Sequence, residues 1–278
     1  MINIVLRGGV GNQLFQFSFG YAMAKKFNTG LIFDLTNYRT DRMREYSLDL
    51  FGGIRGRYDK VVGSLVDIRE DGMPYNQAIV DQIKYDSCVL GYWQTEKYFA
   101  QYAKDLFKIF TPFQPITSMA RDTLREIQNC GNRSVFLTIR RTDYVGNTFH
   151  GELPQSYYDQ ALKYIATEAG IDPHVFVFSD DPKWCEDNFR VPYETTIAGN
   201  FDRTTRDHLG REDEELFLMR NCAHSVCANS SYSWWGSWLA DHNPYLIHKR
   251  IAVAPKQWFG PASNEDPKDI VPDRWVKI

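Results

Sequence analysis

The first 35 residues alternate a strand, a glycine-rich turn, a helix and a second strand. The apolar run at residues 2–6 leads into three glycines between residues 8 and 11. From about residue 11 to residue 27, apolar residues cover most of a helix circumference, Gly30 follows as a stop signal, and residues 31–35 form another β-rich run. Two strands separated by one such helix predict a parallel βαβ unit. Apolar residues on nearly all sides predict a helix that is buried on more than one side.

Further strands and helices alternate along the rest of the chain. The periodicity predicts helices at residues 96–110, 117–129, 154–170 and 213–223, and strands at residues 87–91, 134–139, 174–181 and 245–249, with one more strand after residue 224. Two alternating blocks predict an α/β fold with two parallel-sheet domains, residues 1–131 and residues 132–278. The polar residues 36–87 predict only loops and short helices.

Composition excludes several classes of function. The net charge is −3, so no overall basic field favours nucleic acid as a partner. The five cysteines form no Cys-x-x-Cys pair, which indicates reduced thiols rather than a disulfide framework. No apolar stretch reaches the roughly 18 residues of a membrane span, and no secretory leader precedes the first strand. We therefore expect a cytoplasmic protein without an integral membrane segment, with peripheral attachment at the inner membrane as an alternative.

Charged side chains follow the first strand of the second block. Arg140 and Arg141 stand at its exit, where both side chains can turn toward a ligand. Guanidinium groups bind phosphate oxygens in pairs and stay charged, so the two residues predict a site for a leaving diphosphate; solvated surface charge is the plainer interpretation. Asp143 is either a salt-bridge partner that orients an arginine or a general base.

Two more polar clusters stand where the crevice of a parallel sheet is expected. Asp180 and Asp181 end the next strand, where a carboxylate can accept hydrogen bonds from a guanine edge or a ribose hydroxyl, or can cap the following helix. Ser230, Ser231 and Ser233 begin a helix, whose first N–H groups attract anions. Because ligands bind at the carboxyl ends of parallel strands, these clusters predict a single crevice.

The opening glycines admit two interpretations. A dinucleotide-binding turn needs Gly-x-Gly-x-x-Gly and an acidic residue after the second strand. Gly9, Gly11 and Asp34 fit this pattern, but Leu14 stands where the third glycine belongs. The stretch is therefore either a tight turn with a positive φ or a turn that brings backbone amides and Asn12 against a ligand. An NAD(P)-dependent oxidoreductase built on this βαβ unit is an alternative function.

Four stretches, taken in order, resemble the signatures of one protein family. GGVGNQLFQFSFGYAMAKK resembles a GGxGNQLFQ signature, and LGYWQTEKYF resembles a Gly-Tyr-Trp-Gln-Ser-Glu-Lys stretch. TIRRTDY resembles the H-x-R-R-x-D-Y motif, with Thr138 in place of the histidine and Thr142 in place of the usual glycine. CANSSYSWWGSWL resembles an Asn-Ser-Ser-Phe-Ser-Trp-Trp-Gly block. Together they cover nearly the whole chain, which is similar to the bacterial α-1,2-fucosyltransferases of glycosyltransferase family 11.

The resemblance implies a GT-B fold, in which two Rossmann-like domains face each other across a cleft. It implies inverting transfer of L-fucose from GDP-fucose to the 2-hydroxyl of a galactose-containing oligosaccharide or lipid-linked glycan, in the synthesis of surface polysaccharide such as O-antigen. A fucosyltransferase of another linkage is the alternative. No cofactor and no metal are expected: the chain has no D-x-D motif, so cationic side chains and helix N-termini would stabilise the leaving diphosphate.

The resemblance also implies roles for individual residues. Arg140 would bind the β-phosphate, and Ser230, Ser231 and the Tyr232 amide would bind the diphosphate.

In the same way, Asp180 would read the guanine, and Asn12 would line the cleft from the N-terminal, acceptor-side domain. Asp143 is the first candidate for the general base because the motif places it beside the phosphate-binding arginine, and Glu152 and His150 are the alternates.

Overall fold

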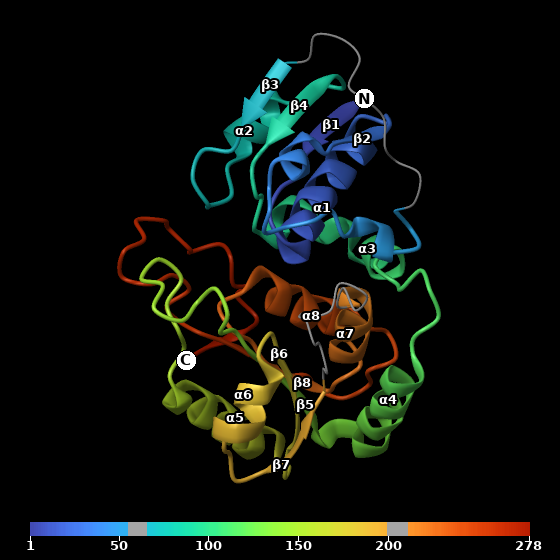
Figure 1. Ribbon diagram of the computed structural model, residues 1–278. Helices are drawn as coiled ribbons and strands as arrows, with labels where there is room; N and C mark the ends of the chain where they lie inside the picture. Colours follow the sequence, from blue (N-terminus) through green and yellow to red (C-terminus); the bar gives the residue numbers. More distant parts are fainter. Residues whose placement is uncertain (55–65, 199–210) are drawn as a thin grey trace. The chain divides into compact units, whose positions relative to one another are not determined.

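The protein consists of two compact α/β units (Figure 1). The computed structural model describes residues 1–54, 66–198 and 211–278. Unit 1 contains Met1–Phe113 and Glu265–Pro272, and unit 2 contains Gln114–Asn264 and Asp273–Ile278. The predicted α/β class with two parallel-sheet units is confirmed. The arrangement of the two units across a cleft stays a prediction.

The division between the units lies nearer the N-terminus than the predicted boundary at residue 131. Helix α4 (Ser118–Cys130) belongs to unit 2, where it packs on α7 (Glu212–Met219). Thr117 caps α4, its N–H donates to the Glu214 carboxylate, and its Oγ1 lies 3.2 Å from Glu214 Oε2. An amphipathic pattern shows that a helix packs on something, but it does not show on which sheet.

Unit 1 is built on a parallel sheet whose described strands have the order β2-β1-β4-β3. The strands are β1 (Ile2–Val5), β2 (Leu31–Asp34), β3 (Val66–Arg69) and β4 (Ser87–Leu90), and the α-helices are α1 (Val10–Lys26), α2 (Gln77–Gln82) and α3 (Ala103–Ile109). Strand β1, helix α1 and strand β2 form the predicted βαβ unit.

Helix α1 is buried on more than one side, as predicted. Phe17 packs edge-on against Phe33 of β2, and Phe19 stacks on Trp93 with ring centroids 3.8 Å apart. The predicted stop at Gly30 is wrong, because the chain already turns at Asn28, whose φ of 49° is in the left-handed region.

Residues 36–87 contain more regular structure than their polar composition predicts. Strand β3 extends the sheet, α2 follows it, and short 3₁₀ turns occur at Thr36–Arg39 and Leu48–Leu50. Residues 55–65 of this segment lie outside the described residues.

The single helix predicted at residues 96–110 is instead two 3₁₀ turns, Glu96–Tyr98 and Ala100–Tyr102, followed by α3.

Unit 2 is built on a second parallel sheet, with the order β10-β9-β8-β5-β6-β7 among the described strands. Helices α5 and α6 lie on one side of it, and α4, α7 and α8 lie on the other (Figure 1). The remaining bounds are β5 (Ser134–Ile139), β6 (His174–Ser179), β7 (Glu194–Ile197), β8 (His224–Val226), β9 (Ala252–Ala254), β10 (Val276–Lys277), α5 (Gln155–Ala169), α6 (Pro182–Asn188) and α8 (Ser231–Asp241); Gly131–Arg133 is a 3₁₀ turn.

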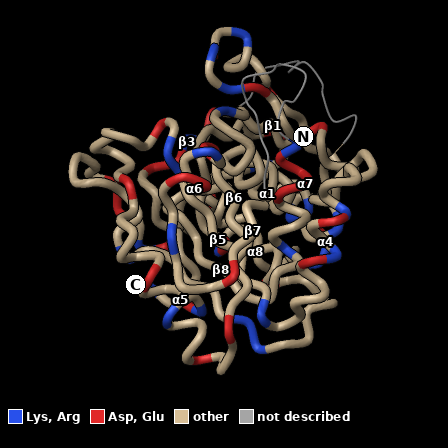
Figure 2. The backbone as a smooth tube through the Cα atoms, turned by 60° about the horizontal axis from the view of Figure 1, so that its bottom comes forward, with Lys and Arg blue, Asp and Glu red and all other residues tan. Residues whose placement is uncertain are grey.

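The central strands of unit 2 are buried and contain no Lys, Arg, Asp or Glu, as expected for parallel strands that are covered on both faces. Strands β5, β6 and β8 are tan throughout in Figure 2, whereas the outer helix α4 carries both signs of charge. The side chains of Val135, Leu137 and Val175 are fully buried together with the apolar face of α5. The predicted end of α5 at Gly170 is confirmed.

The strand predicted at residues 245–249 is wrong. Tyr245 and Ile247 are 81% and 86% exposed, and this segment is a loop. Strand β9, which begins two residues after Arg250 and is buried, pairs with the edge of β8 that β5 does not occupy. Residues 245–249 and residues 252–254 are both short apolar runs, and only the buried second run forms a strand of the sheet.

No helix among the described residues is long and apolar enough to cross a bilayer. The expected cellular location stays a prediction.

Candidate functional site

The polar clusters predicted in unit 2 meet at the carboxyl edge of its sheet. Strands β5 and β6 run in register, with Ile139 beside Ser179, so the residues that follow them emerge together. Arg140, Asp180, Ser230 and Tyr232 line one small hollow at this edge, on the side of the sheet that α7 and α8 cover. The structure thus places these four predicted residues together, whereas Asp143 and Ser231 do not line this hollow.

Arg140 lies between two carboxylates. Its side chain is 15% exposed, one guanidinium nitrogen donates to Asp143 Oδ1, and Nε lies 3.3 Å from Asp180 Oδ2. Burial disfavours the charged guanidinium, but the charges of Asp180 and Asp143 outweigh it and raise the pKa of Arg140 above its ordinary value. The structure thus holds a permanent cation in a site that is largely shielded from water.

Asp180 anchors the loop that carries the arginines. Its Oδ1 accepts the Arg141 N–H at 2.9 Å, and its Oδ2 accepts from the Thr142 hydroxyl at 2.6 Å. The Asp180 side chain is only 1% exposed. The predicted reading of a guanine edge needs an accessible pair of acceptor oxygens, and this geometry instead commits both oxygens to the loop. Thr142, a departure from the family motif, supplies one of these contacts.

Arg141 turns toward helix α6 rather than into the hollow. Its guanidinium carbon lies 3.7 Å from the centre of the Trp184 ring, and Nη1 lies 3.1 Å from Glu152 Oε1. Asp181 accepts the Trp184 N–H at 3.0 Å and is the N-cap of α6, so the capping interpretation of Asp181 is confirmed. The pair that looked equivalent in sequence therefore separates into one residue at the hollow and one that packs on α6.

At the start of α8, Ser230 and Ser233 line the hollow, and Ser231 does not. Ser230 is the N-cap residue but makes no side-chain capping hydrogen bond, and Ser231 is the first helical residue. The third hydroxyl is structural, because Ser233 Oγ bonds to the Thr138 hydroxyl and accepts the Ala228 N–H at 3.1 Å. A helix start without a side-chain cap is a favourable place for an anion.

Thr138 performs a structural role that its sequence position did not reveal. It is 5% exposed and ties β5 to the start of α8, since its Oγ1 also accepts the Ala228 N–H at 2.8 Å. The only sign of this in the sequence was that threonine replaces the histidine of the motif. Thr138 also lines the hollow.

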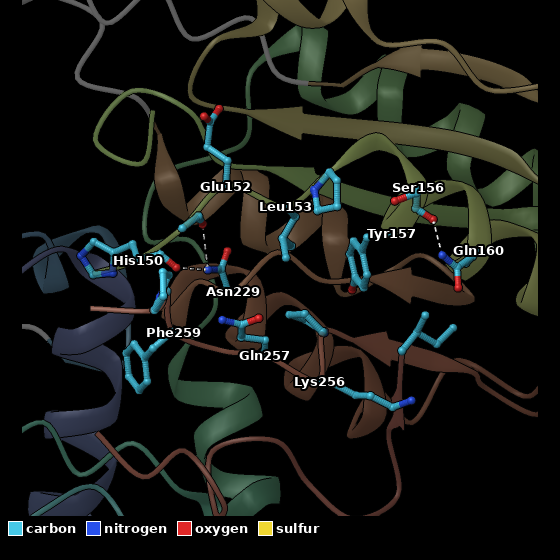
Figure 3. A pocket seen from close by; sticks show the side chains of 16 residues that line it. His150, Glu152, Leu153, Ser156, Tyr157, Gln160, Asn229, Lys256, Gln257 and Phe259 are labelled. Atoms are coloured by element: carbon cyan, nitrogen blue, oxygen red, sulfur yellow. Dashed lines mark hydrogen bonds between the residues drawn. The ribbon is translucent and has the colours of Figure 1, made fainter. Parts of the chain in front are cut away.

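The three candidate bases lie in different surroundings. Asp143 is 32% exposed and is paired with Arg140. Glu152 is paired with Arg141, and His150 stacks on Tyr144 with ring centroids 4.7 Å apart. Glu152 and His150 also belong to the wall of a larger pocket on the α5 side of the sheet (Figure 3). Asp143 is therefore the carboxylate of the three that contacts the Arg140 cation.

The opening glycines of unit 1 form a tight turn. Gly8 has φ +77°, and a Cβ added there would lie 2.5 Å from Asn12 Nδ2. The dinucleotide pattern is not completed, because Leu14 is fully buried and Asp34 Oδ1 accepts the Thr36 N–H at 2.8 Å within its own turn. Asn12 Oδ1 accepts a hydrogen bond from Gln94 Nε2 at 2.7 Å, which fixes the orientation of the Asn12 amide.

A glutamate that the sequence did not single out holds the next turn of unit 1. Glu70, just after β3, accepts the backbone N–H groups of Tyr92 at 2.6 Å and Trp93 at 2.9 Å. Burial raises the pKa of Glu70 to about 7, although the two N–H donors and Arg7 favour the ionised form. This clamp precedes Gln94, so it helps to place the partner of Asn12.

Known proteins resemble the chain along nearly its whole length. It is 30% identical to an alpha-1,2-colitosyltransferase of Escherichia coli over 98% of this chain and 97% of that protein. It is 26% identical to the O-antigen biosynthesis glycosyltransferase WbnK of Escherichia coli, over 98% and 99% of the two chains. It is 22% identical to a galactoside 2-alpha-L-fucosyltransferase of Caenorhabditis elegans, over 100% of this chain and 79% of that protein.

Residues 78–278 match the profile of "Glycosyl transferase family 11". This match includes every unit 2 residue that forms the hollow beside Arg140. The chain belongs to glycosyl transferase family 11.

Proposed function

We propose that the protein transfers L-fucose, or a closely related deoxy sugar, from its GDP-activated form to the 2-hydroxyl of a galactose residue, with inversion at the anomeric carbon. The α-1,2 linkage is supported by the names of two relatives, an alpha-1,2-colitosyltransferase and a galactoside 2-alpha-L-fucosyltransferase. The name of the O-antigen biosynthesis glycosyltransferase supports a surface-polysaccharide acceptor.

The observation that carries the proposal is the position of Arg140. Its shielded guanidinium lines the same hollow as Ser230 and Tyr232, at the start of α8. As the bond to the sugar breaks, negative charge grows on the diphosphate, and a fixed cation beside the N-terminus of a helix stabilises that charge. In this proposal Ser231 and the Tyr232 amide complete the diphosphate site, and no metal is required.

Asp143 is the general base of the proposed reaction. Its contact with Arg140 keeps the carboxylate beside the leaving group, and at 32% exposure it is the less buried of the two carboxylates that contact Arg140. A diphosphate that binds Arg140 would replace Asp143 as its partner and release the carboxylate to accept the proton of the acceptor hydroxyl. Asp180 keeps its hold on the loop and acts as a positioning residue.

The donor sugar is tested directly. Colitose is fucose without the 3-hydroxyl, so GDP-fucose and GDP-colitose differ by one polar group. GDP release is measured with each donor and a panel of galactose-terminated acceptors, and the product linkage is determined by NMR. We expect turnover with one of these donors and an α-1,2 linkage; no GDP release above hydrolysis with either donor, or a different linkage, contradicts the proposal.

The phosphate assignment has a matched control, an arginine at the other end of the same strand. Arg140→Ala should reduce turnover by at least about 100-fold, since a charged hydrogen bond contributes roughly 1.5–3 kcal/mol and the charge is lost as well. Arg133, which directly precedes β5 at the opposite edge of the sheet and pairs with Glu194, serves as control: Arg133→Ala should leave turnover unchanged. Near-normal turnover of Arg140→Ala in a folded protein contradicts the assignment.

Independence from a metal follows from the same charge argument. Turnover should be unchanged in EDTA, because Arg140 and the start of α8 supply the positive charge. Loss of activity in EDTA that returns on adding Mn²⁺ or Mg²⁺ would overturn this part of the proposal.

A further inference from the structure

A second hollow of unit 2 lies at the carboxyl edge of the sheet and is separate from the Arg140 site. It has a volume of about 410 Å³ and lies between the first turn of α5, the residues around Asn229 and the loop after β9. Leu153, Tyr157 and Asn229 surround its centre in Figure 3. Its volume falls within the range of about 300–1,000 Å³ that is typical of small-molecule sites.

The walls of this pocket are held by Asn229, which is 5% exposed. Asn229 Nδ2 donates to the carbonyl oxygens of His150 at 2.8 Å, Gly151 at 3.2 Å and Trp258 at 3.1 Å, and so joins two loops. Gly260 lets these loops meet, because a Cβ there would lie 2.3 Å from the Thr148 carbonyl oxygen. The pocket is therefore formed by the fold itself and does not depend on a ligand to shape it.

The chemistry of the lining suits a sugar ring. Leu153, Pro255 and Phe259 supply apolar surface, and the Gln257 amide, the Ser156 hydroxyl and the Lys256 ammonium group supply hydrogen-bonding groups at the exposed side. Sugars present apolar C–H faces and a rim of hydroxyls, so they need both kinds of group. The one carboxylate side chain of the wall, Glu152, points away from the centre (Figure 3) and is paired with Arg141.

The position of the pocket relates it to the Arg140 site without merging the two. Asn229 directly precedes Ser230, and the loop that ends in Glu152 begins at Arg140. Arg140, Ser230 and Tyr232 belong to the hollow on the α7 and α8 side, and none of them lines this pocket. A sugar bound here therefore lies close to the proposed transfer site but does not contact the diphosphate groups.

We propose that this pocket binds a sugar of the acceptor glycan other than the galactose that receives the transferred residue. The inference rests on the proposed function and extends it, because it makes the length of the acceptor a determinant of affinity. It predicts that the protein distinguishes a galactose-terminated oligosaccharide from a single galactoside through residues of unit 2.

The test compares lactose and a galactose-terminated trisaccharide with methyl β-galactoside. Gln257→Ala removes one hydrogen-bonding group, Ser156→Trp fills the pocket from an exposed position, and Gln128→Ala on the exposed side of α4 is the control. We expect Gln257→Ala to raise the KM for the oligosaccharides about threefold to tenfold, as the loss of a single hydrogen bond does, and Ser156→Trp to raise it further. The KM for methyl β-galactoside, the KM for the donor and the thermal shift with GDP should not change.

A binding measurement separates this inference from the proposed function. Saturation-transfer NMR with the same oligosaccharides should show binding to the wild type and to Gln128→Ala, and should lose it in Ser156→Trp. If no acceptor is turned over but this pattern holds, the proposed function fails and the pocket assignment stands. Unchanged oligosaccharide binding and KM in both pocket variants, with melting temperatures like the wild type, overturn the assignment, as does an absence of binding to the wild type.

Discussion

At the scale of single residues, the site depends on buried polar groups whose partners are supplied by the fold. Asp180 shows this most directly, because its side chain is 1% exposed and joins the Arg141 N–H, the Thr142 hydroxyl and the Arg140 guanidinium. A buried carboxylate with such partners is costly to alter, since the largely buried Arg140 guanidinium would lose one of its two carboxylates. Asp180 therefore acts on the reaction by placing Arg140.

Thr138 offers a stability test of the same kind. Thr138→Val keeps the shape but removes the hydroxyl that meets Ser233 and the Ala228 N–H, so the free energy of unfolding should fall by about 1–2 kcal/mol. Urea denaturation of Thr138→Val, Ser233→Ala and the double variant measures this. The double variant should lose less than the sum of the two single losses, because they remove the same contact; strictly additive losses would mean that the two hydroxyls do not interact.

Glu70 predicts a dependence of stability on pH. The pKa of Glu70 is raised to about 7 in the folded protein, so the folded state holds its proton more tightly than the unfolded chain. This contribution to stability is complete below the ordinary pKa and is lost as the pH rises through the window from about 4.5 to about 7, by at most roughly 1.4 kcal/mol per pH unit. Glu70→Gln, which carries no titrating group, should remove this part of the slope.

Urea denaturation at several pH values between 4.5 and 8 measures that slope. Glu168→Gln, a change at an exposed position of α5, is the control and should retain the wild-type slope. A Glu70→Gln protein whose stability follows the wild-type curve at every pH would show that Glu70 does not titrate in this window.

At the scale of elements, the short helix α6 supports Arg141. Asp181 caps α6 through the Trp184 N–H, and the Trp184 ring lies under the Arg141 guanidinium. Asp181→Ala should cost about 1 kcal/mol of stability, as the loss of an N-cap does, and should disturb Arg141 more than Arg140. Because Arg140 has its own partners, we expect the affinity for GDP, measured by calorimetry, to change less than twofold. A loss of GDP affinity as large as that of Arg140→Ala would contradict this separation of the two arginines.

At the scale of the whole molecule, the chain returns to unit 1 near its end. Within unit 1, Asp269 bonds to Lys97 Nζ at 2.6 Å and to the Tyr75 N–H at 2.9 Å, and these contacts hold Glu265–Pro272 in place. Burial alone would raise the pKa of Asp269, but the Lys97 contact and the Tyr75 N–H outweigh it and lower the pKa. This contribution to stability is therefore present above the ordinary pKa of aspartate and is lost as the pH falls through the lowered value.

Asp269→Asn should lower the melting temperature at neutral pH and have a smaller effect at acid pH, where Asp269 is protonated in the wild type as well. The pair is partly exposed on the lysine side, so we expect a loss of only about 1 kcal/mol. Calorimetric scans at pH 7 and pH 3, with Asp266→Asn at an exposed position nearby as control, measure the difference. An equal loss at both pH values would mean that the charge of Asp269 contributes nothing.

The sequence by itself determined the α/β class, most of the helices and central strands, and the groups at the carboxyl edge of the second sheet. Those features depend on local periodicity, and the residues that follow parallel strands must emerge at one edge. The four motifs also placed the chain in its family. The helix now labelled α4 was predicted, but it packs in unit 2, and the strand predicted at residues 245–249 is instead β9. A short apolar run or an amphipathic helix does not show which surface covers it.

Only the tertiary structure decided which partners and roles the neighbouring polar residues have. Arg140 and Arg141 are adjacent and alike in sequence, yet one is held between Asp143 and Asp180 and the other lies on Trp184. Asp180 and Trp184 lie about 40 residues further along the chain. Which pairs form is decided by burial, because leaving a buried charge without a partner is costly. The clamp formed by Glu70 and the pocket around Asn229 are unrecognisable in sequence for the same reason, since both exist only where distant loops meet.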